Sequence, residues 1–209
     1  MREEYPKINT IFERDPKTKK IVEGKFISDE FKYLKDLDWE FTEKIDGTNI
    51  RIYWDGYKVS FYGRTDNSQI PSDLVNRLIE KFSGEANEEL FEQKFGKMEV
   101  MLFCEGCGGK IQGLNYFEKQ DIVLFDVMID GKFQPRDSIT NIAEYFGILR
   151  VPILFTGTLG EGVDYVKENH FSFINTDIKM EGLVGRPKVE LQDRVGNRMI
   201  VKIKWKDFS

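Results

Sequence analysis

The stretch Glu43-Lys44-Ile45-Asp46-Gly47-Thr48-Asn49 carries the most information in this sequence. It places a lysine two residues before an Asp-Gly pair, between two segments whose residues alternate as in strands. A lysine amine that has lost its proton is a nucleophile that can form a covalent intermediate. The stretch therefore indicates a site of phosphoryl-type transfer at the end of a strand. A solvated surface lysine is the alternative for this residue taken alone.

The neighbours of Lys44 decide whether its amine could react. Side chains two residues apart share one face of an extended strand, so Lys44 and Asp46 are predicted to lie on the same face. An ammonium group is not a nucleophile, and nearby cations favour the neutral amine. Lys202 and Lys204, or a metal ion, are expected to supply that positive charge.

Four further residues offer groups that suit a nucleotide. Asn49 has an amide for ribose or phosphate oxygens. Arg64, after the second strand of a predicted hairpin, has a guanidinium fork that binds phosphates or carboxylates. Glu105 precedes a glycine-rich loop and Glu181 precedes an apolar strand, and both carboxylates suit a hydrated metal ion. Taken alone, Glu105 has the alternative of a loop acid, Glu181 that of a strand-end charge and Arg64 that of a solvated arginine.

Two later segments complete the candidate set. Phe125 and Asp126 end an apolar run, and the ring is either a core residue or a platform on which a base stacks. Lys202 and Lys204 lie on one face of a predicted strand, where two point charges could converge on a phosphate. A half-exposed strand is the alternative for this lysine pair.

Composition sets limits on the class of protein. The chain has 209 residues, a net charge of −5 and 40% hydrophobic residues, which suits one substantial domain. The acidic balance argues against loose, charge-driven coating of nucleic acid. No apolar run approaches the roughly 20 residues of a membrane helix, and residues 1–7 show no secretory signal. Cys104 and Cys107 are interpreted as reduced, structural thiols of a cytoplasmic protein.

The periodicity of the sequence predicts an α+β fold with antiparallel hairpins and a few covering helices. Two-residue turns are expected at Asp55-Gly56 and Asp130-Gly131. Residues 5–24 are polar and hold a turn at 15–20. The expected strands are 39–44, 49–54, 57–62, 99–103, 122–128, 182–185 and 199–205. The expected helices are 71–82, 86–95, 137–146 and 158–169.

The charged residues form an ordered series that resembles the covalent nucleotidyltransferases, the superfamily of polynucleotide ligases and RNA capping enzymes. The resemblance spans nearly the whole chain, and five motifs in order are more specific than any one of them. The motifs are Lys44-Ile45-Asp46-Gly47, Phe103-Cys104-Glu105-Gly106, Phe125-Asp126, Glu181-Gly182-Leu183-Val184 and Lys202-Ile203-Lys204.

Within that superfamily the sequence is most similar to ATP-dependent RNA ligases of the nick-sealing type, including small phage enzymes. The features shared with that branch are Glu43, Thr48-Asn49, Gly108-Gly109-Lys110-Ile111-Gln112, and the lead-in segments Tyr5-Pro6-Lys7-Ile8 and Phe12-Glu13-Arg14. The resemblance implies a single nucleotidyltransferase domain over residues 1–209, without an OB-fold, on which residues 1–38 pack as a lead-in segment.

The resemblance also implies a role for each matching residue. Lys44 would attack the α-phosphorus of ATP and hold AMP. Lys202 and Lys204 would neutralise the α-phosphate. Asp46, Glu105 and Glu181 would hold a hydrated Mg²⁺ or Mn²⁺, and Glu105, Arg64 and Asn49 would contact ribose or phosphate. Phe125 and Val184 would sandwich the adenine ring. The backbone around Glu43 and Ile45 would recognise the adenine edge.

The expected substrates are ATP and nicked or broken RNA ends. We expect a monomer that acts in the cytoplasm, whether or not it is phage-encoded, and no membrane partner. Larger ligases carry a further C-terminal domain, whereas this sequence ends after the Lys202/Lys204 strand. We therefore expect a minimal ligase, or an adenylyltransferase module served by an accessory RNA-binding protein. A DNA ligase, a GTP-dependent capping guanylyltransferase and an inactive nucleotide-binding protein are the competing hypotheses.

Overall fold

The computed structural model describes residues 3–109 and 111–209 and divides the chain into two compact units. The first unit joins the N-terminal residues up to Tyr5 to Asp46–Val151. The second joins Pro6–Ile45 to Pro152–Ser209. Lys110, part of one resembling motif, and the first two residues of the chain lie outside the described residues. A single nucleotidyltransferase domain over residues 1–209 stays a prediction.

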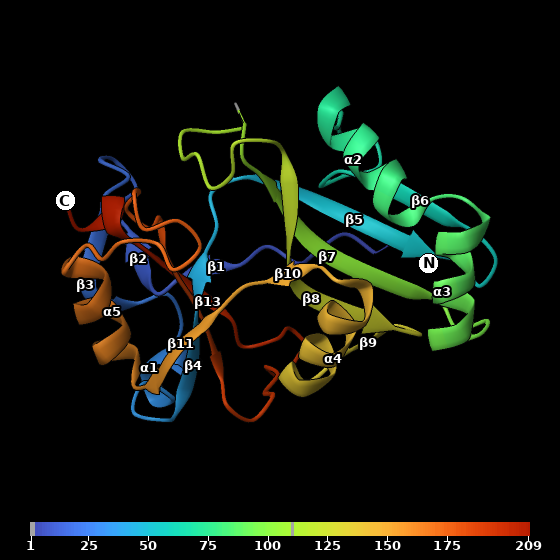
Figure 1. Ribbon diagram of the computed structural model, residues 1–209. Helices are drawn as coiled ribbons and strands as arrows, with labels where there is room; N and C mark the ends of the chain where they lie inside the picture. The colour runs from blue at the N-terminus through green and yellow to red at the C-terminus, as the bar shows by residue number, and fades with distance from the viewer. Residues whose placement is uncertain (1–2, 110) are drawn as a thin grey trace. The chain divides into compact units, whose positions relative to one another are not determined.

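The first unit is built on a six-stranded sheet, in which five strands follow the order β10-β8-β7-β5-β6 and β9 pairs with β8 (Figure 1). All pairs are antiparallel except β10 with β8. The strands are β5 (Thr48–Trp54), β6 (Val59–Tyr62), β7 (Val100–Cys107), β8 (Asp121–Ile129), β9 (Lys132–Phe133) and β10 (Leu149–Arg150).

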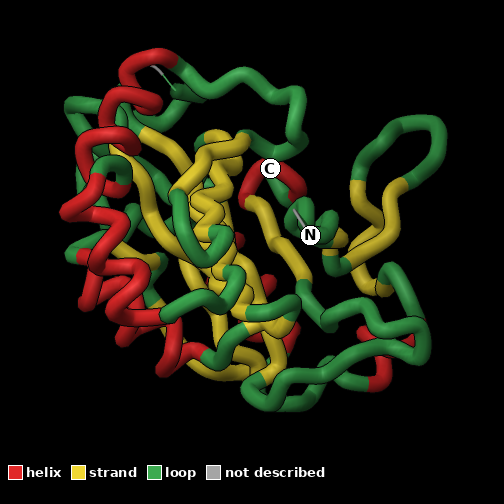
Figure 2. The backbone as a smooth tube through the Cα atoms, turned by 90° about the vertical axis from the view of Figure 1, so that its right-hand side faces the viewer, coloured by secondary structure: helices red, strands yellow, loops and turns green. Residues whose placement is uncertain are grey.

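Three helices cover one face of this sheet: α2 (Ser72–Phe82), α3 (Glu85–Phe95) and α4 (Arg136–Phe146). Figure 2 shows helices gathered along one side of the strands. In α2, apolar residues recur every four positions, so Leu74, Leu78 and Phe82 are buried on one stripe. Helix α4 ends where Gly147 adopts a left-handed conformation, as predicted from the sequence.

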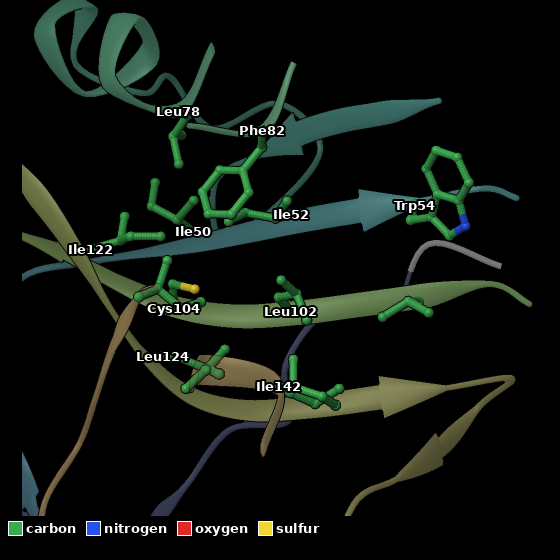
Figure 3. Packing of buried hydrophobic residues seen from close by; sticks show 14 of the residues in the cluster. Ile50, Ile52, Trp54, Leu78, Phe82, Leu102, Cys104, Ile122, Leu124 and Ile142 are labelled. Atoms are coloured by element: carbon green, nitrogen blue, oxygen red, sulfur yellow. The ribbon is translucent and has the colours of Figure 1, made fainter. Parts of the chain in front are cut away.

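Alternation along the strands gives the sheet two different faces. Ile50 and Ile52 point toward the helices and are fully buried with Leu102 and Cys104 (Figure 3). Each such side chain stabilises the fold by roughly 1.5–3 kcal/mol. The intervening residues of β5 and β7 face the other side, and Asn49 lies directly opposite Glu105 there. The candidate polar residues Asn49 and Glu105 therefore share the helix-free face.

The second unit holds a five-stranded sheet in the order β1-β13-β12-β4-β11, in which only the β1–β13 pair is parallel. Helix α5 (Leu159–Lys167) packs on one face and begins at a capping box formed by Thr158 and Glu161. The strands are β1 (Asn9–Thr10), β4 (Trp39–Lys44), β11 (Ile153–Gly157), β12 (Gly182–Pro187) and β13 (Val201–Lys204).

A smaller sheet and two short helices complete this unit. Strands β2 (Phe12–Arg14) and β3 (Ile21–Phe26) pair with each other, followed by α1 (Asp29–Tyr33). A 3-10 turn, Trp205–Asp207, follows β13. Asp15 accepts backbone hydrogen bonds from Lys17 and Thr18, which closes the turn between β2 and β3.

The predicted α+β class is confirmed, and several boundaries are corrected. The expected strand 99–103 continues as β7 through Glu105, so that residue lies inside a strand and not after it. The prediction of a two-residue turn at Asp55-Gly56 is wrong. Asp55 accepts hydrogen bonds from the backbone N–H groups of Tyr57 and Lys58, so the loop runs through Lys58. Strands β1, β2, β3, β10 and β11 and helix α1 were not predicted.

The expectation that Lys44 and Asp46 lie on one strand is also wrong. Strand β4 ends at Lys44, and Asp46 begins the main segment of the other unit. Although Lys44 and Asp46 are two residues apart, they do not lie on the same face of one strand.

No helix among the described residues is long and apolar enough to cross a membrane.

Replacing Gly182 by alanine should destabilise the second unit strongly. Gly182 has φ +155°, and a Cβ there would lie 2.0 Å from the carbonyl oxygen of Ile203 on the neighbouring strand. We expect a loss of at least about 2 kcal/mol in the free energy of unfolding, measured by urea denaturation. The matched control is Gly113→Ala, where a Cβ meets nothing within 4 Å. Equal stability of the two variants would contradict this account of β12.

Candidate active site

Lys44, Glu181 and Lys204 form a compact charged cluster in the second unit. The two oxygens of the Glu181 carboxylate contact different lysines: Oε2 lies 2.6 Å from Lys44 Nζ, and Oε1 lies 2.5 Å from Lys204 Nζ. Lys44 Nζ also donates to the carbonyl oxygen of Ile45 at 3.3 Å. The side chains are 11–22% exposed, so the cluster is mostly shielded from water. The structure thus brings together three predicted site residues from separate motifs.

Strand register explains this convergence. Gly182 on β12 lies opposite Lys44 on β4 and opposite Lys204 on β13, and β12 runs between these two strands. Because Gly182 has no side chain, nothing stands between the two lysines on that row. Glu181 immediately precedes it and reaches both. Val184 lies two residues further on the same face, opposite Lys202.

The ionisation of this cluster follows from its charges. Burial alone would raise the pKa of Glu181, but attraction by Lys44 and hydrogen bonds from Lys204 and Lys44 outweigh it, so the pKa is lowered. Burial lowers the pKa of Lys202, and repulsion from Lys204, Lys44 and Lys7 adds to that effect. The sheet face therefore combines an ionised carboxylate with a lysine that is held unfavourably in its charged form.

Glu43, next to the candidate nucleophile, points to the opposite side of β4. Its side chain is buried, and Oε2 accepts a hydrogen bond of 2.9 Å from the backbone N–H of Phe173. Burial raises the pKa of Glu43, although Ser172 and the backbone of Phe173 oppose the shift by hydrogen bonding. The side chain of Glu43 therefore fastens the segment before Glu181, a structural role that the sequence did not indicate.

The polar candidates of the first unit lie around the start of β5. Asn49 and Glu105 are cross-strand neighbours, and the buried Oδ1 of Asn49 has no hydrogen-bond partner among the described residues. The backbone N–H of Asp46 donates to the hydroxyl of Tyr116 at 3.2 Å. A Cβ at Gly47 would lie 2.3 Å from the carbonyl oxygen of Gly106, so this position requires glycine because strand β7 approaches closely.

Phe125 owes its orientation to an irregularity in β8. Phe103 pairs with Asp126 and Cys104 pairs with Leu124, so the register shifts by one residue at Phe125, as in a β-bulge. Tyr5 packs edge-on against Phe125 with ring centroids 4.9 Å apart. Its hydroxyl donates to the buried Asp126 at 2.8 Å. Phe125 is half-buried and braced from one side, and the sequence did not reveal Tyr5 as its support.

Arg64 is exposed and makes no ion pair with another described residue. The loop that carries it is held by Arg51, a fully buried side chain on the helix-free face. Arg51 Nε donates to the carbonyl of Gly63 at 2.8 Å, and Nη2 lies 2.7 Å from Asp66 Oδ1. Sequence reasoning missed Arg51, although a charged residue inside the apolar strand Ile50–Trp54 is a visible signal.

Within residues 3–109 and 111–209, no group of three or more His, Cys, Asp or Glu side chains is arranged as a direct metal site. The predicted ligands Asp46 and Glu105 belong to the first unit, and Glu181 belongs to the second. A hydrated ion held partly through water stays a prediction, as do the individual roles of the site residues. Cys104 and Cys107 are buried and not joined in a disulfide, and burial raises the pKa of Cys104.

The Glu181→Gln variant should show how far the lysine bridge stabilises the fold. Because the folded pKa of Glu181 is lowered, its contribution is present above the unfolded value of 4.5 and is lost as pH falls through the folded value. Near neutral pH we expect a loss of about 1–3 kcal/mol in urea denaturation, shrinking in acid. Glu23→Gln, which removes an exposed partner of Lys167, is the control and should have little effect. A loss for Glu181→Gln that does not depend on pH would count against the bridge.

Comparisons with known proteins place the chain among the RNA ligases. Three solved structures of Naegleria gruberi RNA ligase mutants, one apo, one with AMP and Mn and one with ATP and Mn, superpose with TM-scores of 0.63, 0.65 and 0.64. Each is 18% identical; the matches cover 96–98% of this chain and 57–58% of those chains. At that identity the likeness shows the fold, which agrees with the predicted nucleotidyltransferase type.

This chain thus spans less than three fifths of the length of those ligases and matches no curated protein sequence. A family model described as RNA ligase matches residues 37–204, which is well over half of the chain and includes every predicted motif from Glu43 to Lys204. The chain belongs to the RNA ligase family.

Proposed function

We propose that this protein is an ATP-dependent RNA ligase that works through a lysyl-AMP intermediate. The observation that carries the proposal is the contact of Lys44 with a carboxylate that also binds Lys204, inside a segment matching the RNA ligase family. The protein would transfer AMP to an RNA 5′-phosphate and join that end to a 3′-hydroxyl. Neither a DNA ligase nor a capping guanylyltransferase is favoured by the family match.

In the first step Lys44 acts as the nucleophile. Its neutral Nζ attacks the α-phosphorus of ATP, a nitrogen–phosphorus bond forms, and the bond to the bridging oxygen breaks. Pyrophosphate leaves with the electron pair of that bond, and the proton that Nζ loses passes to pyrophosphate or to solvent. Lys202 and Lys204 neutralise charge on the α-phosphate, which is the main requirement of phosphoryl-type transfer. Burial lowers the pKa of Lys202, and repulsion from Lys204 and Lys44 adds to that effect.

The next two steps use the bound AMP. An oxygen of the RNA 5′-phosphate attacks the phosphorus of AMP, and the nitrogen–phosphorus bond breaks, so that Lys44 regains a proton. The 3′-hydroxyl of the second RNA end then attacks the 5′-phosphorus. AMP leaves, and a phosphodiester joins the two ends. Placing these groups in line supplies most of the catalysis, since no further side-chain chemistry is required.

For the remaining site residues we propose binding roles. Phe125 and Val184 stack on adenine, and the backbone around Glu43 and Ile45 recognises its edge. The unpartnered Asn49 Oδ1 suits a hydroxyl donor such as ribose. In the same proposal Glu105 also binds ribose, and Arg64 binds ribose or phosphate.

A divalent cation fits the donor chemistry of Asp46, Glu105 and Glu181. Mg²⁺ and Mn²⁺ prefer carboxylate oxygens and keep several waters. Both Glu181 oxygens contact ammonium groups, which favours contact with the ion through water. When bound, the ion would neutralise phosphate charge.

The proposed substrates are nicked or broken RNA ends, and the proposed setting is the cytoplasm. The Naegleria structures whose titles name ATP or AMP with Mn support the choice of nucleotide and metal. A monomer is proposed, with an accessory RNA-binding protein as a further proposal.

Lys44→Ala should abolish covalent labelling. When the protein is incubated with Mg²⁺ and ATP labelled at the α-phosphate, label should stay on the wild-type band in a denaturing gel. Removing the nucleophile should reduce it at least about 100-fold. Lys20→Ala, at an exposed lysine of the same unit, is the control and should label normally. Labelling that survives Lys44→Ala would exclude this nucleophile.

Lys202→Met should separate stability from activity. The lowered pKa of Lys202 means that its charge opposes folding at every pH below the folded value, and this deficit disappears above the unfolded value of 10.5. We expect Tm to rise by about 2–4 °C at neutral pH, while lysyl-AMP formation falls at least about tenfold. The exposed Lys206→Met is the control for both readouts. A variant that melts lower and labels normally would contradict the assignment.

A further inference from the structure

The segment of residues 168–180, called here the aromatic loop, presents two large rings to solvent. Phe171 is 52% exposed and Phe173 is 61% exposed, and Phe173 makes no ring contact with another described residue. The loop connects α5 to Glu181, which holds Lys44 and Lys204. Exposed neighbouring aromatics that serve no core are a feature of binding surfaces.

The loop has a fixed conformation. Phe171 and Lys179 form an isolated antiparallel bridge, and the backbone N–H of Ser172 donates to the carbonyl of Ile178 at 2.9 Å. The Ser172 side chain is buried, and its Oγ accepts hydrogen bonds from Ile174 and Asn175 at 3.0 and 3.2 Å. The backbone that carries the rings is therefore held in place before any partner binds, which reduces the entropy lost on binding.

Two points of the aromatic loop are connected to the surroundings of the candidate nucleophile, Lys44. The backbone N–H of Phe173 donates to the buried carboxylate of Glu43, the residue directly before Lys44. The other end of the loop runs into Glu181, which contacts Lys44 Nζ at 2.6 Å. The exposed rings are thus attached through short, buried connections to the residues that would form lysyl-AMP.

One positive charge, that of Lys179, lies beside the Phe171 ring. Lys179 Nζ lies 3.7 Å from the centroid of the Phe171 ring and donates to the carbonyl of Asn169 at 2.7 Å. An ammonium group has three donors, so Lys179 keeps the capacity to bind a phosphate. Aromatic rings beside a lysine match single-stranded nucleic acid, in which flat bases alternate with phosphates.

We propose that Phe171 and Phe173 stack on unpaired bases of the RNA strand to be joined, while Lys179 binds a phosphate of the same strand. This inference rests on the proposed function and adds an RNA-binding element that lies outside the family's nucleotide motifs. It makes the RNA contact separable from the reaction of Lys44 with ATP.

The first test compares RNA affinity among side-chain variants. We expect the Phe171→Leu/Phe173→Leu double variant to bind labelled single-stranded RNA at least about tenfold more weakly in fluorescence anisotropy, because leucine stays apolar but cannot stack. The Phe171→Tyr/Phe173→Tyr variant should bind like the wild type. Tyr33→Ala removes an aromatic that is 89% exposed in the same unit and is the control.

The second test uses salt. Lys179→Gln should reduce the slope of log K against log salt by about 0.7, the value for one phosphate contact on a single strand. The Phe171→Leu/Phe173→Leu variant should keep the wild-type slope. Both variants should form lysyl-AMP from labelled ATP without RNA at the wild-type level, since the hydrogen bond to Glu43 uses backbone atoms.

The outcomes distinguish this inference from the proposed function. Absence of lysyl-AMP in the wild type would refute the proposed function, while RNA affinities would still decide the role of the aromatic loop. Equal RNA affinity of the wild type and the leucine variant, or no RNA binding by either, would overturn the inference. A wild-type dimer that the leucine substitutions convert to monomers in sedimentation, with unchanged RNA affinity, would assign the rings to self-association instead.

Discussion

The chemistry of the second unit depends on the ion pairs that the Glu181 carboxylate forms with two lysines. The carboxylate lies between Lys44 and Lys204, which would otherwise repel each other at the ends of the two strands that flank β12. A carboxylate in this position offsets the repulsion between the two ammonium groups, so both lysines can lie close together in a largely buried place. In the proposed function, the same ammonium groups would turn to the phosphate of ATP. The bridge therefore holds the resting site together, and its exchange for substrate phosphate is the event that would start the reaction.

Backbone geometry makes the bridge possible. Gly182 occupies the row between the two lysines with φ +155°, and any side chain there would collide with the backbone of β13. On the other face of β4, the buried Glu43 ties down the aromatic loop. Consecutive residues of one strand thus serve separate tasks, since Lys44 faces the candidate phosphate site and Glu43 fixes the segment that leads to Glu181.

Much of this arrangement could be predicted from the sequence. Strand β4 and helix α4 show clear periodicity and stop signals, and the alternation of Lys202 with apolar neighbours correctly placed Lys202 and Lys204 on one face. Glu181 was chosen as a site residue, but nothing in its local sequence indicated the contact with Lys44. That contact joins residues 137 positions apart, so only sheet pairing could reveal it.

The elements and contacts that the sequence did not predict also have physical explanations. Strands β2 and β3 are short and largely exposed, so they lack the apolar alternation that marks a strand. Tyr5 supports Phe125 from a distant position, and that contact leaves no local pattern. Arg51 is visible as a charge inside an apolar strand, but the sequence does not show that it reaches the loop that carries Arg64. The spacing of Lys44 and Asp46 suggested a continuous strand, because periodicity does not show where pairing ends.

The central claim is that the ε-amine of Lys44 forms a phosphoramidate with AMP. Mass spectrometry of peptides from protein incubated with ATP and Mg²⁺ tests it most directly. The account predicts one adenylyl group, labile in acid, on the peptide that contains Lys44. An adenylyl group on Lys202, on Lys204 or on any other residue, or no adduct at all, would contradict it.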